Sequence, residues 1–494
     1  MTKHDVVIIG AGGVGCAVAR ELSRYNLNII VLEKECDAAG GISGRNSAVV
    51  HAGFNNAPGS LMAKLCVEGN RGFEALCREL DIPYKKTGKL LVAFDETDMN
   101  ALQEIMQQGI RNGCEGLRLV DADEMEKLAP GIGGIGGMYS PETAVFDPFL
   151  YCIALAENAL ENGVTFHFNS EVVAIEHDMI EEHGEEHSDD RFVVKTAEGG
   201  AYACRFLINC AGLSSGNISE MAGGPAYQIY PCRGEYFILD KVAEELLPMP
   251  VYPAPRKGIG GLGVHLTPTT AGNIIIGPSA EYISQIDDLS TTRPVMDELF
   301  AKAKALMPAL ERKYIIGSYA GIRPKLAPPE EGGYRDFIIQ EEADCPGLIN
   351  LIGIESPGLT ASVPIARMVR GIIGERMPLE EKKDFVAKRK GPIRFRDLSE
   401  EEQAELIRED SEFGEIICRC QKVTKREIRN AIENPFGARS ISAIKYRAWA
   451  TTGRCNGGYC LTRIVDMLVN EYGVKPEEIT YRSTGSELFS GKVK

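Results

Sequence analysis

The 494-residue sequence has no long apolar run and no excess of positive charge. No stretch approaches the roughly 20 consecutive apolar residues of a membrane-spanning helix, so we expect no transmembrane segment. Lys and Arg number 54 against 70 Asp and Glu, and the formal net charge is −16. Because nucleic acids and anionic lipid surfaces bind basic faces, this balance argues against either as a partner. A small anionic substrate needs only local positive groups and is not excluded.

The features of a secretion signal are also lacking. The first residues enter an apolar strand without the charged, apolar and small-residue segments of a signal peptide, so we expect a mature chain starting near Met1. Fourteen cysteines are present, and ten of them are scattered through apolar segments. This usage is typical of small core residues in a reducing compartment and predicts a cytoplasmic protein. The length and the 44% hydrophobic content predict a globular chain of two to four domains.

The clearest motif is an apolar strand followed by a glycine-rich turn, V-V-I-I-G-A-G-G-V-G, at residues 6–15. An amphipathic stretch and a second strand follow, and the second strand ends at Glu33. In a dinucleotide-binding βαβ unit, Gly10 allows the tight turn, Gly12 the approach of a pyrophosphate, and Gly15 the packing of helix on strand. The helix N-terminus would face the phosphate, and Glu33 would accept hydrogen bonds from the ribose hydroxyls. An ordinary glycine-rich turn is the alternative.

A polar loop rich in Gly, Ser and Asn follows at residues 35–53. If it returns toward the cofactor pyrophosphate, Ser43, Asn46 and Ser47 are its candidate hydrogen-bond donors. His51 lies in a short apolar run at the end of this loop and is a candidate for the redox centre. The alternative for a lone histidine in such a setting is a core residue with satisfied hydrogen bonds.

Apolar spacing predicts helices over residues 59–80, 97–130 and 148–162. Residues 228–280 alternate between apolar and polar side chains with turn residues between the runs, which is the pattern of an antiparallel sheet. A run of acids and histidines at 176–190 follows no metal-ligand spacing. We therefore favour a solvated hairpin tip there over a metal site.

A second strand–glycine–helix unit occurs late in the chain. The apolar strand 348–354 leads into S-P-G-L-T and then a helix. This order predicts a segment that returns to the nucleotide-binding sheet and places a helix N-terminus near the cofactor. The charged residues 375–390 indicate a connection between domains, and residues 412–494 a small separate unit.

Together these motifs resemble the flavoprotein oxidoreductases of the D-amino-acid-oxidase type over roughly residues 4–375. The marks, beyond the first turn and Glu33, are N-C-A-G at 209–212, G-I-R-P at 321–324 and the closing S-P-G-L-T at 356–360. The resemblance implies that the bound dinucleotide is FAD.

The same resemblance implies the site residues. Arg323 would bind the anionic group of the substrate, since a planar guanidinium matches a carboxylate or phosphate bidentately. A surface ion pair is the alternative for Arg323. His51 would lie beside the flavin and is the first candidate for the proton-accepting base, with His265 the second. The implied FAD-binding residues are Gly10, Gly12, Gly15, Glu33, Ser43, Asn46, Ser47, Val172, Ala211, Gly212, Gly358, Leu359 and Thr360.

Four cysteines stand apart near the C-terminus. Cys418 and Cys420 form a C-x-C pair, and Cys455 and Cys460 follow after 34 residues as C-x4-C. Four thiolates with little else reactive nearby suit a metal centre. The pattern resembles the bacterioferritin-associated-ferredoxin-like [2Fe-2S] domain that follows the flavin domain in anaerobic glycerol-3-phosphate dehydrogenases. Structural zinc is the first alternative, and a pair of disulfides is a weaker one.

The expected fold is α/β, with α+β character overall. It consists of a Rossmann-type FAD-binding domain, an interleaved antiparallel-sheet substrate domain, and a small helical iron–sulfur domain. The expected segments are 1–80, 145–225 and 335–375 for the FAD-binding domain, 81–144 and 226–334 for the substrate domain, 376–411 for a linker, and 412–494 for the [2Fe-2S]-binding domain.

We therefore expect an FAD-dependent dehydrogenase acting on a small anionic hydroxy compound, with glycerol 3-phosphate as the first choice. Hydride would pass from the substrate to the flavin while a histidine takes the hydroxyl proton, and a [2Fe-2S] centre would deliver electrons to a partner redox subunit. Two sets of motifs favour different substrates. The iron–sulfur tail favours glycerol 3-phosphate, whereas residues 51–70, 232–236 and 263–268 resemble the L-2-hydroxyglutarate dehydrogenase branch. An amine or amino-acid substrate and a non-catalytic electron-transfer subunit are further alternatives.

Overall fold

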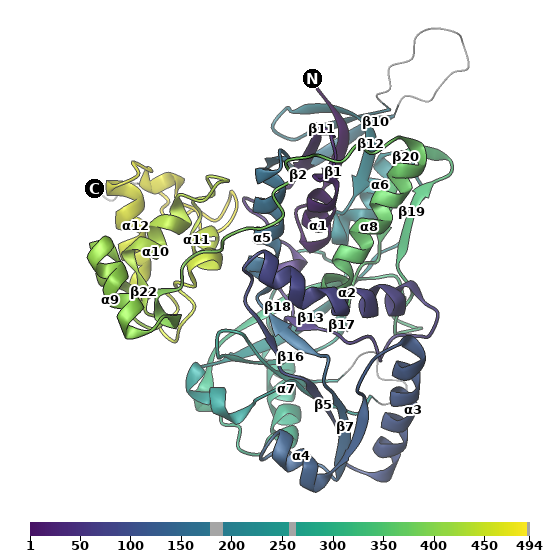
Figure 1. The fold of residues 1–494 in the computed structure, drawn as a ribbon, viewed down its shortest axis with the longest axis vertical. Coiled ribbons are helices and arrows are strands. Elements are labelled where there is room, and N and C mark those ends of the chain that lie inside the picture. The colour runs from purple at the N-terminus through teal and green to yellow at the C-terminus, as the bar shows by residue number, and fades with distance from the viewer. Residues whose placement is uncertain (178–190, 256–262, 492–494) are drawn as a thin grey trace.

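The computed structural model describes residues 1–177, 191–255 and 263–491. Two domains built on sheets are stacked along the long axis of the molecule, and a helical C-terminal domain lies beside the first of them (Figure 1). Of the hairpin tip expected at 176–190, residues 178–190 lie outside the described part. Among the described residues, no helix has the length and apolar character needed to cross a membrane.

The first sheet is organised around the predicted βαβ unit. Strand β1 (Thr2–Ile9) leads through α1 (Gly13–Leu22) to β2 (Ile29–Leu32), and β1 pairs in parallel with both β2 and β12 (Ala201–Asn209). The strand order is β10-β11-β12-β1-β2-β9. Strand β20 (Cys345–Ile352) pairs in parallel with the end of β12, so the late strand does return to this sheet. The other elements of this layer are β9 (Thr165–His167), β10 (Val172–His177), β11 (Phe192–Thr196), β19 (Ile338–Glu342), α2 (Leu61–Glu79), α5 (Pro148–Glu161), α6 (Ser215–Met221) and α8 (Gly358–Arg376).

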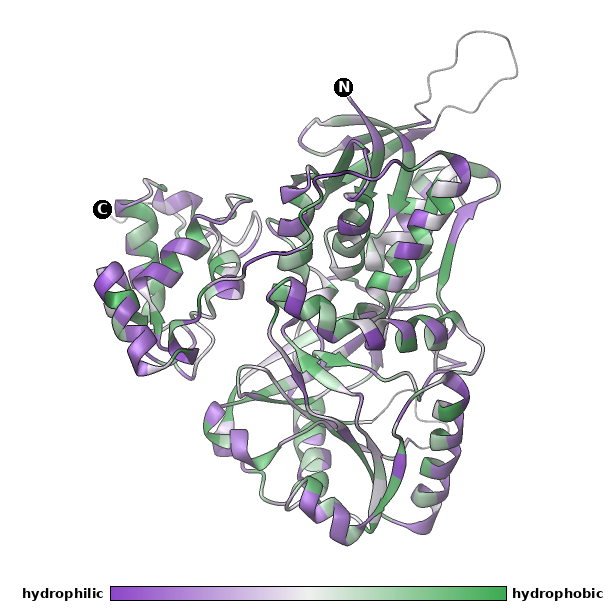
Figure 2. Cartoon of the chain, viewed as in Figure 1, coloured by the Kyte–Doolittle hydropathy of each residue, from purple (hydrophilic) through white to green (hydrophobic). Residues whose placement is uncertain are grey.

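The core of this domain explains its apolar strands. Val6, Val7 and Ile8 of β1 are each 0% exposed, because helices and neighbouring strands cover both faces of the sheet. Helix α5 begins as expected, with Asp147 accepting hydrogen bonds from the N–H groups of Phe149 and Leu150. The strands are mostly green in Figure 2, whereas α9 (Glu400–Glu409), in the C-terminal domain, is mostly purple.

The second sheet forms the floor of the other domain. Its order is β17-β13-β16-β15-β14-β5-β7-β6, with β18 paired to β13, and all pairs are antiparallel except that of β14 with β5. The predicted antiparallel sheet over 228–280 is therefore present. Its elements are β5 (Lys89–Ala93), β6 (Arg118–Asp121), β7 (Gly136–Ser140), β13 (Tyr230–Leu239), β14 (Val251–Pro253), β15 (His265–Pro268), β16 (Ile274–Gly277), β17 (Glu281–Tyr282), β18 (Ile315–Lys325), α3 (Glu96–Asn112), α4 (Ala122–Leu128) and α7 (Arg293–Leu306).

The prediction of continuous helix over 97–130 is wrong. Helix α3 ends at Asn112, because Gly113 adopts the left-handed conformation with φ of +85°. The chain then forms β6 as an edge strand on β7 before α4 begins. Four residues with one buried side chain carry too little pattern to be recognised as a strand.

A small sheet and the C-terminal domain complete the fold. Strands β3 (Val49–Val50) and β4 (Tyr84–Lys86) both pair with β8 (Ala144–Phe146). The C-terminal domain contains β21 (Ile416–Cys418), β22 (Val423–Thr424), α10 (Lys425–Ile432), α11 (Ile441–Ala448) and α12 (Cys460–Asn470) around its own apolar core.

The segment that joins the C-terminal domain to the rest lies along the first domain. The N–H of Lys382 donates to the carbonyl of Arg24 at 2.7 Å. The N–H of Val386 donates to Asn162 Oδ1 at 2.8 Å. Further along, the N–H of Gly391 donates to Asp81 Oδ2 at 2.9 Å. The first part of the expected linker over 376–411 is thus bound to the domain it leaves, whereas its last part forms α9 and lies with the C-terminal domain (Figure 1).

Candidate active site

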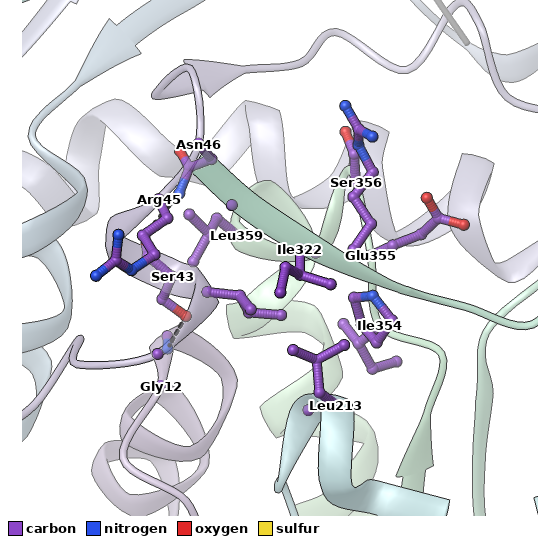
Figure 3. Close-up of a pocket in the computed structure, with 18 of the residues that line it drawn as sticks. Gly12, Ser43, Arg45, Asn46, Leu213, Ile322, Ile354, Glu355, Ser356 and Leu359 are labelled. Carbon is purple, nitrogen blue, oxygen red and sulfur yellow. Dashed lines mark hydrogen bonds between the residues drawn. The ribbon is translucent and has the colours of Figure 1, made fainter. Parts of the chain in front are cut away.

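One large pocket lies between the two sheet domains. Its volume is about 800 Å³, within the range of cofactor and small-molecule sites. The turn after β1, the end of β2, residues 40–51, the start of α8 and the second sheet all contribute to its wall. In Figure 3, Ser43 and Arg45 lie on one side of this pocket and Glu355 and Ser356 on the other.

The glycine turn after β1 leaves room for a phosphate group. Gly10 has φ of +105°, and a Cβ there would lie 2.6 Å from a neighbouring carbonyl oxygen. A Cβ on Gly15 would lie 1.9 Å from the Gly10 carbonyl oxygen, so α1 packs on β1 only without a side chain there. Gly10 and Gly12 line the pocket, whereas Gly15 lies behind it. The N–H of Gly13, in the first turn of α1, donates to Ser43 Oγ at 2.9 Å.

Glu33 is fixed at the end of β2. Its Oε2 accepts from the N–H of Ala11 at 2.6 Å, and its Oε1 accepts from the N–H of Glu35 at 2.9 Å. Burial raises the pKa of the Glu33 carboxyl, and the two backbone donors oppose that rise. Each oxygen keeps a further lone pair that a ribose hydroxyl can use.

The polar residues of the loop after β2 have separate tasks. Asn46 Nδ2 donates to the Ser43 carbonyl at 2.6 Å, and its Oδ1 accepts from the N–H of Ala48 at 2.8 Å. The Asn46 amide therefore shapes the loop, while the Ser43 hydroxyl holds the first turn of α1. Together with Ser47, both residues line the pocket.

Segments far apart in the sequence supply the remaining predicted FAD contacts. Thr360 Oγ1, in the first turn of α8, accepts a hydrogen bond from the N–H of His51 at 3.1 Å. The structure therefore brings all the predicted FAD-binding residues except Gly15 to one pocket wall. The residues beyond the first turn and its loop are Val172, Ala211, Gly212, Gly358, Leu359 and Thr360.

His51 is a half-buried neutral imidazole that lines this pocket. Its Nε2 lies 3.3 Å from Ser356 Oγ, and its backbone is held by Thr360. Burial, together with the charge of Lys89, lowers the pKa of His51 to about 3. At neutral pH the ring is therefore uncharged, the form required of a proton acceptor.

His265 presents a free nitrogen to the same space. Its ring stacks on Tyr252 with centroids 3.7 Å apart and planes 8° from parallel. Because Nδ1 lies 3.0 Å from the Gly263 carbonyl, the proton belongs on Nδ1 and the lone pair on Nε2. The buried Nε2 has no hydrogen-bond partner among the described residues, and burial lowers the pKa of the ring.

Arg323 lines the pocket without forming an ion pair with any described residue. Its Nη2 donates to the Ser279 carbonyl at 3.3 Å, and its Nη1 lies 3.6 Å from Cys232 Sγ. The neighbouring Lys325 differs, because its ammonium lies 3.1 Å from Glu355 and both side chains are nearly fully buried. Of the two neighbouring cations, Arg323 is therefore the one without a carboxylate partner among the described residues, and its guanidinium can bind an anion.

The four C-terminal cysteines lie in two pairs. Cys420 Sγ and Cys455 Sγ are 3.5 Å apart, and Cys418 forms a hydrogen bond with Cys460 that lowers the pKa of Cys418 to about 6. No three His, Cys, Asp or Glu side chains in the described part are grouped to hold a metal ion. All four cysteines are free thiols, so the disulfide alternative finds no support. Cys420 and Cys455 are exposed, while Cys418 and Cys460 are buried.

Comparison with known families identifies both parts of the chain. Residues 5–371 match the FAD dependent oxidoreductase family. The chain belongs to this family. Residues 416–470 match the BFD-like [2Fe-2S] binding domain, which includes all four cysteines. The expected flavoprotein family, FAD and a [2Fe-2S] centre are therefore confirmed.

Individual relatives of this FAD-dependent oxidoreductase fall into two groups. The glycerol 3-phosphate dehydrogenase of Caloramator mitchellensis is 38% identical over 493 residues, which cover 99% of each chain. The mitochondrial L-2-hydroxyglutarate dehydrogenase of Arabidopsis thaliana is 34% identical over 406 residues, covering 74% of this chain and 83% of the relative. Among solved structures, the L-alpha-glycerophosphate oxidase of Mycoplasma pneumoniae with FAD bound superposes with a TM-score of 0.72 at 28% identity, covering 78% of this chain and 98% of that one.

Both cofactors fit the residues present. The glycine turn, the start of α1 and Glu33 all line the pocket and offer the phosphate and ribose contacts of a dinucleotide. A [2Fe-2S] cluster takes four thiolate ligands, two on each iron, and the four cysteines lie in two pairs. A single zinc ion would need all four sulfur atoms around one centre.

Two pocket features were missed in the sequence. Arg45 lines the pocket, and burial lowers the pKa of its guanidinium. Lys89 lies behind the pocket, with its ammonium 3.4 Å from the centroid of the Tyr252 ring. A lysine that opens the apolar run L-L-V-A-F at a buried strand position is the signal that could have drawn attention to it.

Proposed function

We propose that this FAD-dependent oxidoreductase is a dehydrogenase that oxidises glycerol 3-phosphate and passes the electrons through its [2Fe-2S] domain to a separate redox protein. The observation that carries the proposal is the 38% identity to a glycerol 3-phosphate dehydrogenase over the whole chain, iron–sulfur domain included. The Arabidopsis relative covers 74% of the chain. The unpaired Arg323 in the pocket wall suits a substrate that carries a phosphate.

Arg323 is the proposed anion-binding residue. Its guanidinium is fixed by the Ser279 carbonyl and reaches the pocket from β18 in the second sheet. A bidentate contact with a phosphate would hold the substrate by its charged end, so that its hydroxyl-bearing carbon has one orientation.

His51 is the proposed proton acceptor, and His265 is its alternative. Both rings are neutral at the pH of the cell, and a bound dianion would raise the pKa of either ring toward a useful value. Ser356 orients His51 through its hydroxyl, and stacking on Tyr252 orients His265.

Electron output is assigned to the C-terminal domain. When bound, FAD accepts a hydride equivalent and the [2Fe-2S] cluster carries single electrons. The exposed Cys420 and Cys455 mark the side of the cluster site that a partner protein would approach. The free state of all fourteen cysteines supports a reducing compartment, which we take to be the cytoplasm.

L-2-Hydroxyglutarate is the second candidate substrate. The 34% identity to the Arabidopsis dehydrogenase and the matching motifs at 51–70, 232–236 and 263–268 favour it. A carboxylate would use Arg323 in the same way as a phosphate, so the pocket cation does not separate the two substrates.

Anaerobic reduction of the bound flavin tests the proposal. Glycerol 3-phosphate and L-2-hydroxyglutarate are added separately to the purified protein, and the visible spectrum is followed. We expect loss of flavin absorbance with glycerol 3-phosphate and no loss with glycerol, which lacks the anion. Bleaching by L-2-hydroxyglutarate alone would reassign the substrate. A flavin that neither compound reduces would contradict the dehydrogenase assignment.

A further inference from the structure

The C-terminal domain packs on the loop that covers the phosphate end of the FAD pocket. Ser483 Oγ donates to Glu35 Oε2 at 2.6 Å and accepts from the N–H of Cys36 at 3.2 Å. Cys36 Sγ also lies 3.3 Å from Ser440 Oγ, at the start of α11. These contacts hold the chain directly after Glu33, where the loop leaves β2.

A buried ion pair reinforces this contact. Arg447 of α11 binds Asp37 with both terminal guanidinium nitrogens, and Nη2 lies 3.1 Å from Oδ1; both side chains are 5% exposed. Asp37 Oδ1 also accepts from the N–H of Ala38 at 2.8 Å. Removing one partner of such a pair leaves a buried charge unmatched, so the loop conformation depends on the neighbouring domain.

An aromatic stack between α5 and α11 lies against the same loop. The rings of Phe149 in α5 and Tyr446 in α11 are stacked with centroids 4.0 Å apart. The Phe149 ring also excludes a side chain at position 44 of the loop, because a Cβ on Gly44 would lie 2.5 Å from the ring. The loop that carries Ser43 and Arg45 is therefore held between the pocket and the C-terminal domain.

Arg482 is the residue by which the C-terminal domain reaches the described pocket wall. Its backbone is fixed on both sides, because its N–H donates to Ser486 Oγ at 2.8 Å and its carbonyl accepts from Thr480 Oγ1 at 2.7 Å. The side chain is half-buried and forms no ion pair with a described carboxylate. The next residue, Ser483, binds Glu35 and Cys36, so Arg482 enters the wall beside the loop that follows Glu33.

We propose that Arg482 of the C-terminal domain is an FAD-binding residue that contacts the diphosphate across the domain interface. The pocket wall at this end contains the carboxylates Glu33 and Glu35, so a bound diphosphate needs cations nearby. Arg482 and Arg45 supply them from opposite sides of the interface. The family match ends at residue 371, so the FAD-binding domain gains this contact only through its C-terminal neighbour.

Two arginine variants of the full chain test the proposal. R482A removes the proposed contact, and R439A removes an exposed arginine of the same domain that lies over the Tyr472 ring, away from the pocket. Apoprotein of each is titrated with FAD by flavin fluorescence, and with ADP as a probe of the diphosphate end. Iron content and cluster absorbance verify that the domain is intact.

We expect R482A to bind FAD and ADP about 10- to 100-fold more weakly than the parent chain, as for loss of a charge-assisted hydrogen bond. R439A should bind both with unchanged affinity. Equal FAD and ADP affinity in R482A and the parent, with the cluster intact, would overturn the proposal. R447M supplies a second measurement, because release of the loop should speed FAD dissociation, and an unchanged rate in folded R447M would argue against coupling between the domains. These readouts do not depend on which substrate the enzyme oxidises.

Discussion

Replacement of Lys89 by Met should stabilise this protein at neutral pH and have little effect on stability in alkali. Lys89 is 1% exposed on β5, and no described carboxylate forms an ion pair with it. Its ammonium lies over the faces of Tyr252, at 3.4 Å, and Phe54, at 5.2 Å from the ring centroids. Burial lowers the pKa of Lys89 from 10.5 to about 7.

The size and sign of the effect follow from this pKa. Between pH 7 and pH 10.5 the unfolded chain binds a proton that the folded protein does not, so stability of the parent protein rises with pH. At 1.36 kcal/mol per pKa unit, the shift corresponds to an upper bound of about 5 kcal/mol, present in full below pH 7 and lost above pH 10.5. Met has nearly the volume of the Lys stem and no charge, so K89M removes this cost without opening a cavity.

The titratable groups around Lys89 do not reverse the expected gain in stability of K89M at neutral pH. Cys66 on α2 faces it with a thiol whose pKa burial raises, so no thiolate forms at neutral pH. His51 and His265 face it as neutral rings. Each is held uncharged partly by the lysine, so K89M should also raise the pKa of both histidines.

Thermal unfolding from pH 6.5 to 10 measures this prediction. The control is K86M, which removes an exposed lysine of the preceding strand that pairs with Glu142. We expect the Tm difference between K89M and the parent to be several degrees at pH 7 and to shrink steadily toward pH 10, with no such trend in K86M. A Tm difference that is independent of pH would refute the reasoning, because it would mean that Lys89 keeps an ordinary pKa in the folded protein.

Three further predictions concern other residues of the site. R323M should raise KM for the anionic substrate at least about 100-fold. The control R367M, which removes an exposed arginine, should leave steady-state kinetics unchanged. Equal KM values in R323M and the parent protein would contradict the anion-binding role. K325M should lower the free energy of unfolding by about 3–5 kcal/mol by leaving Glu355 buried and unpaired, and K325M/E355Q should recover much of that loss in the same denaturation measurement; no recovery would mean that the ion pair is not the cause. G15A should prevent FAD retention, measured as flavin absorbance per chain, because its Cβ would lie 1.9 Å from the Gly10 carbonyl oxygen, whereas G371A on the open face of α8 should retain FAD fully.

Local patterns in the sequence were sufficient for the nucleotide-binding unit. The run from Val6 to Gly15 combines strand, turn and helix signals in consecutive residues, and each glycine has its own steric reason. The same holds for α5, where Asp147 precedes Pro148 at the first helical position. Such signals can be found without knowledge of what packs against them.

Features that depend on distant contacts were missed. Strand β6 forms by pairing with the edge of β7, and the sequence of its four residues does not indicate this pairing. Lys89 is notable only because Tyr252, His51 and His265 surround it in the fold. Arg482 lies in an unremarkable polar tail, and its place in the FAD pocket depends on how two domains pack together. No pattern within a single segment carries that information.

The way the connecting segment lies on the first domain affects how electrons leave the enzyme. A free tether would let the C-terminal domain travel between a loading and an unloading position, and solvent viscosity would then limit turnover. Here Lys382, Val386 and Gly391 bind the surface of the first domain, and α11 is held by Arg447. When both cofactors are bound, we therefore expect electron transfer within the chain to need no movement of the C-terminal domain. Diffusion enters only when the external acceptor arrives, so added glycerol or sucrose should slow acceptor turnover without slowing the first electron step.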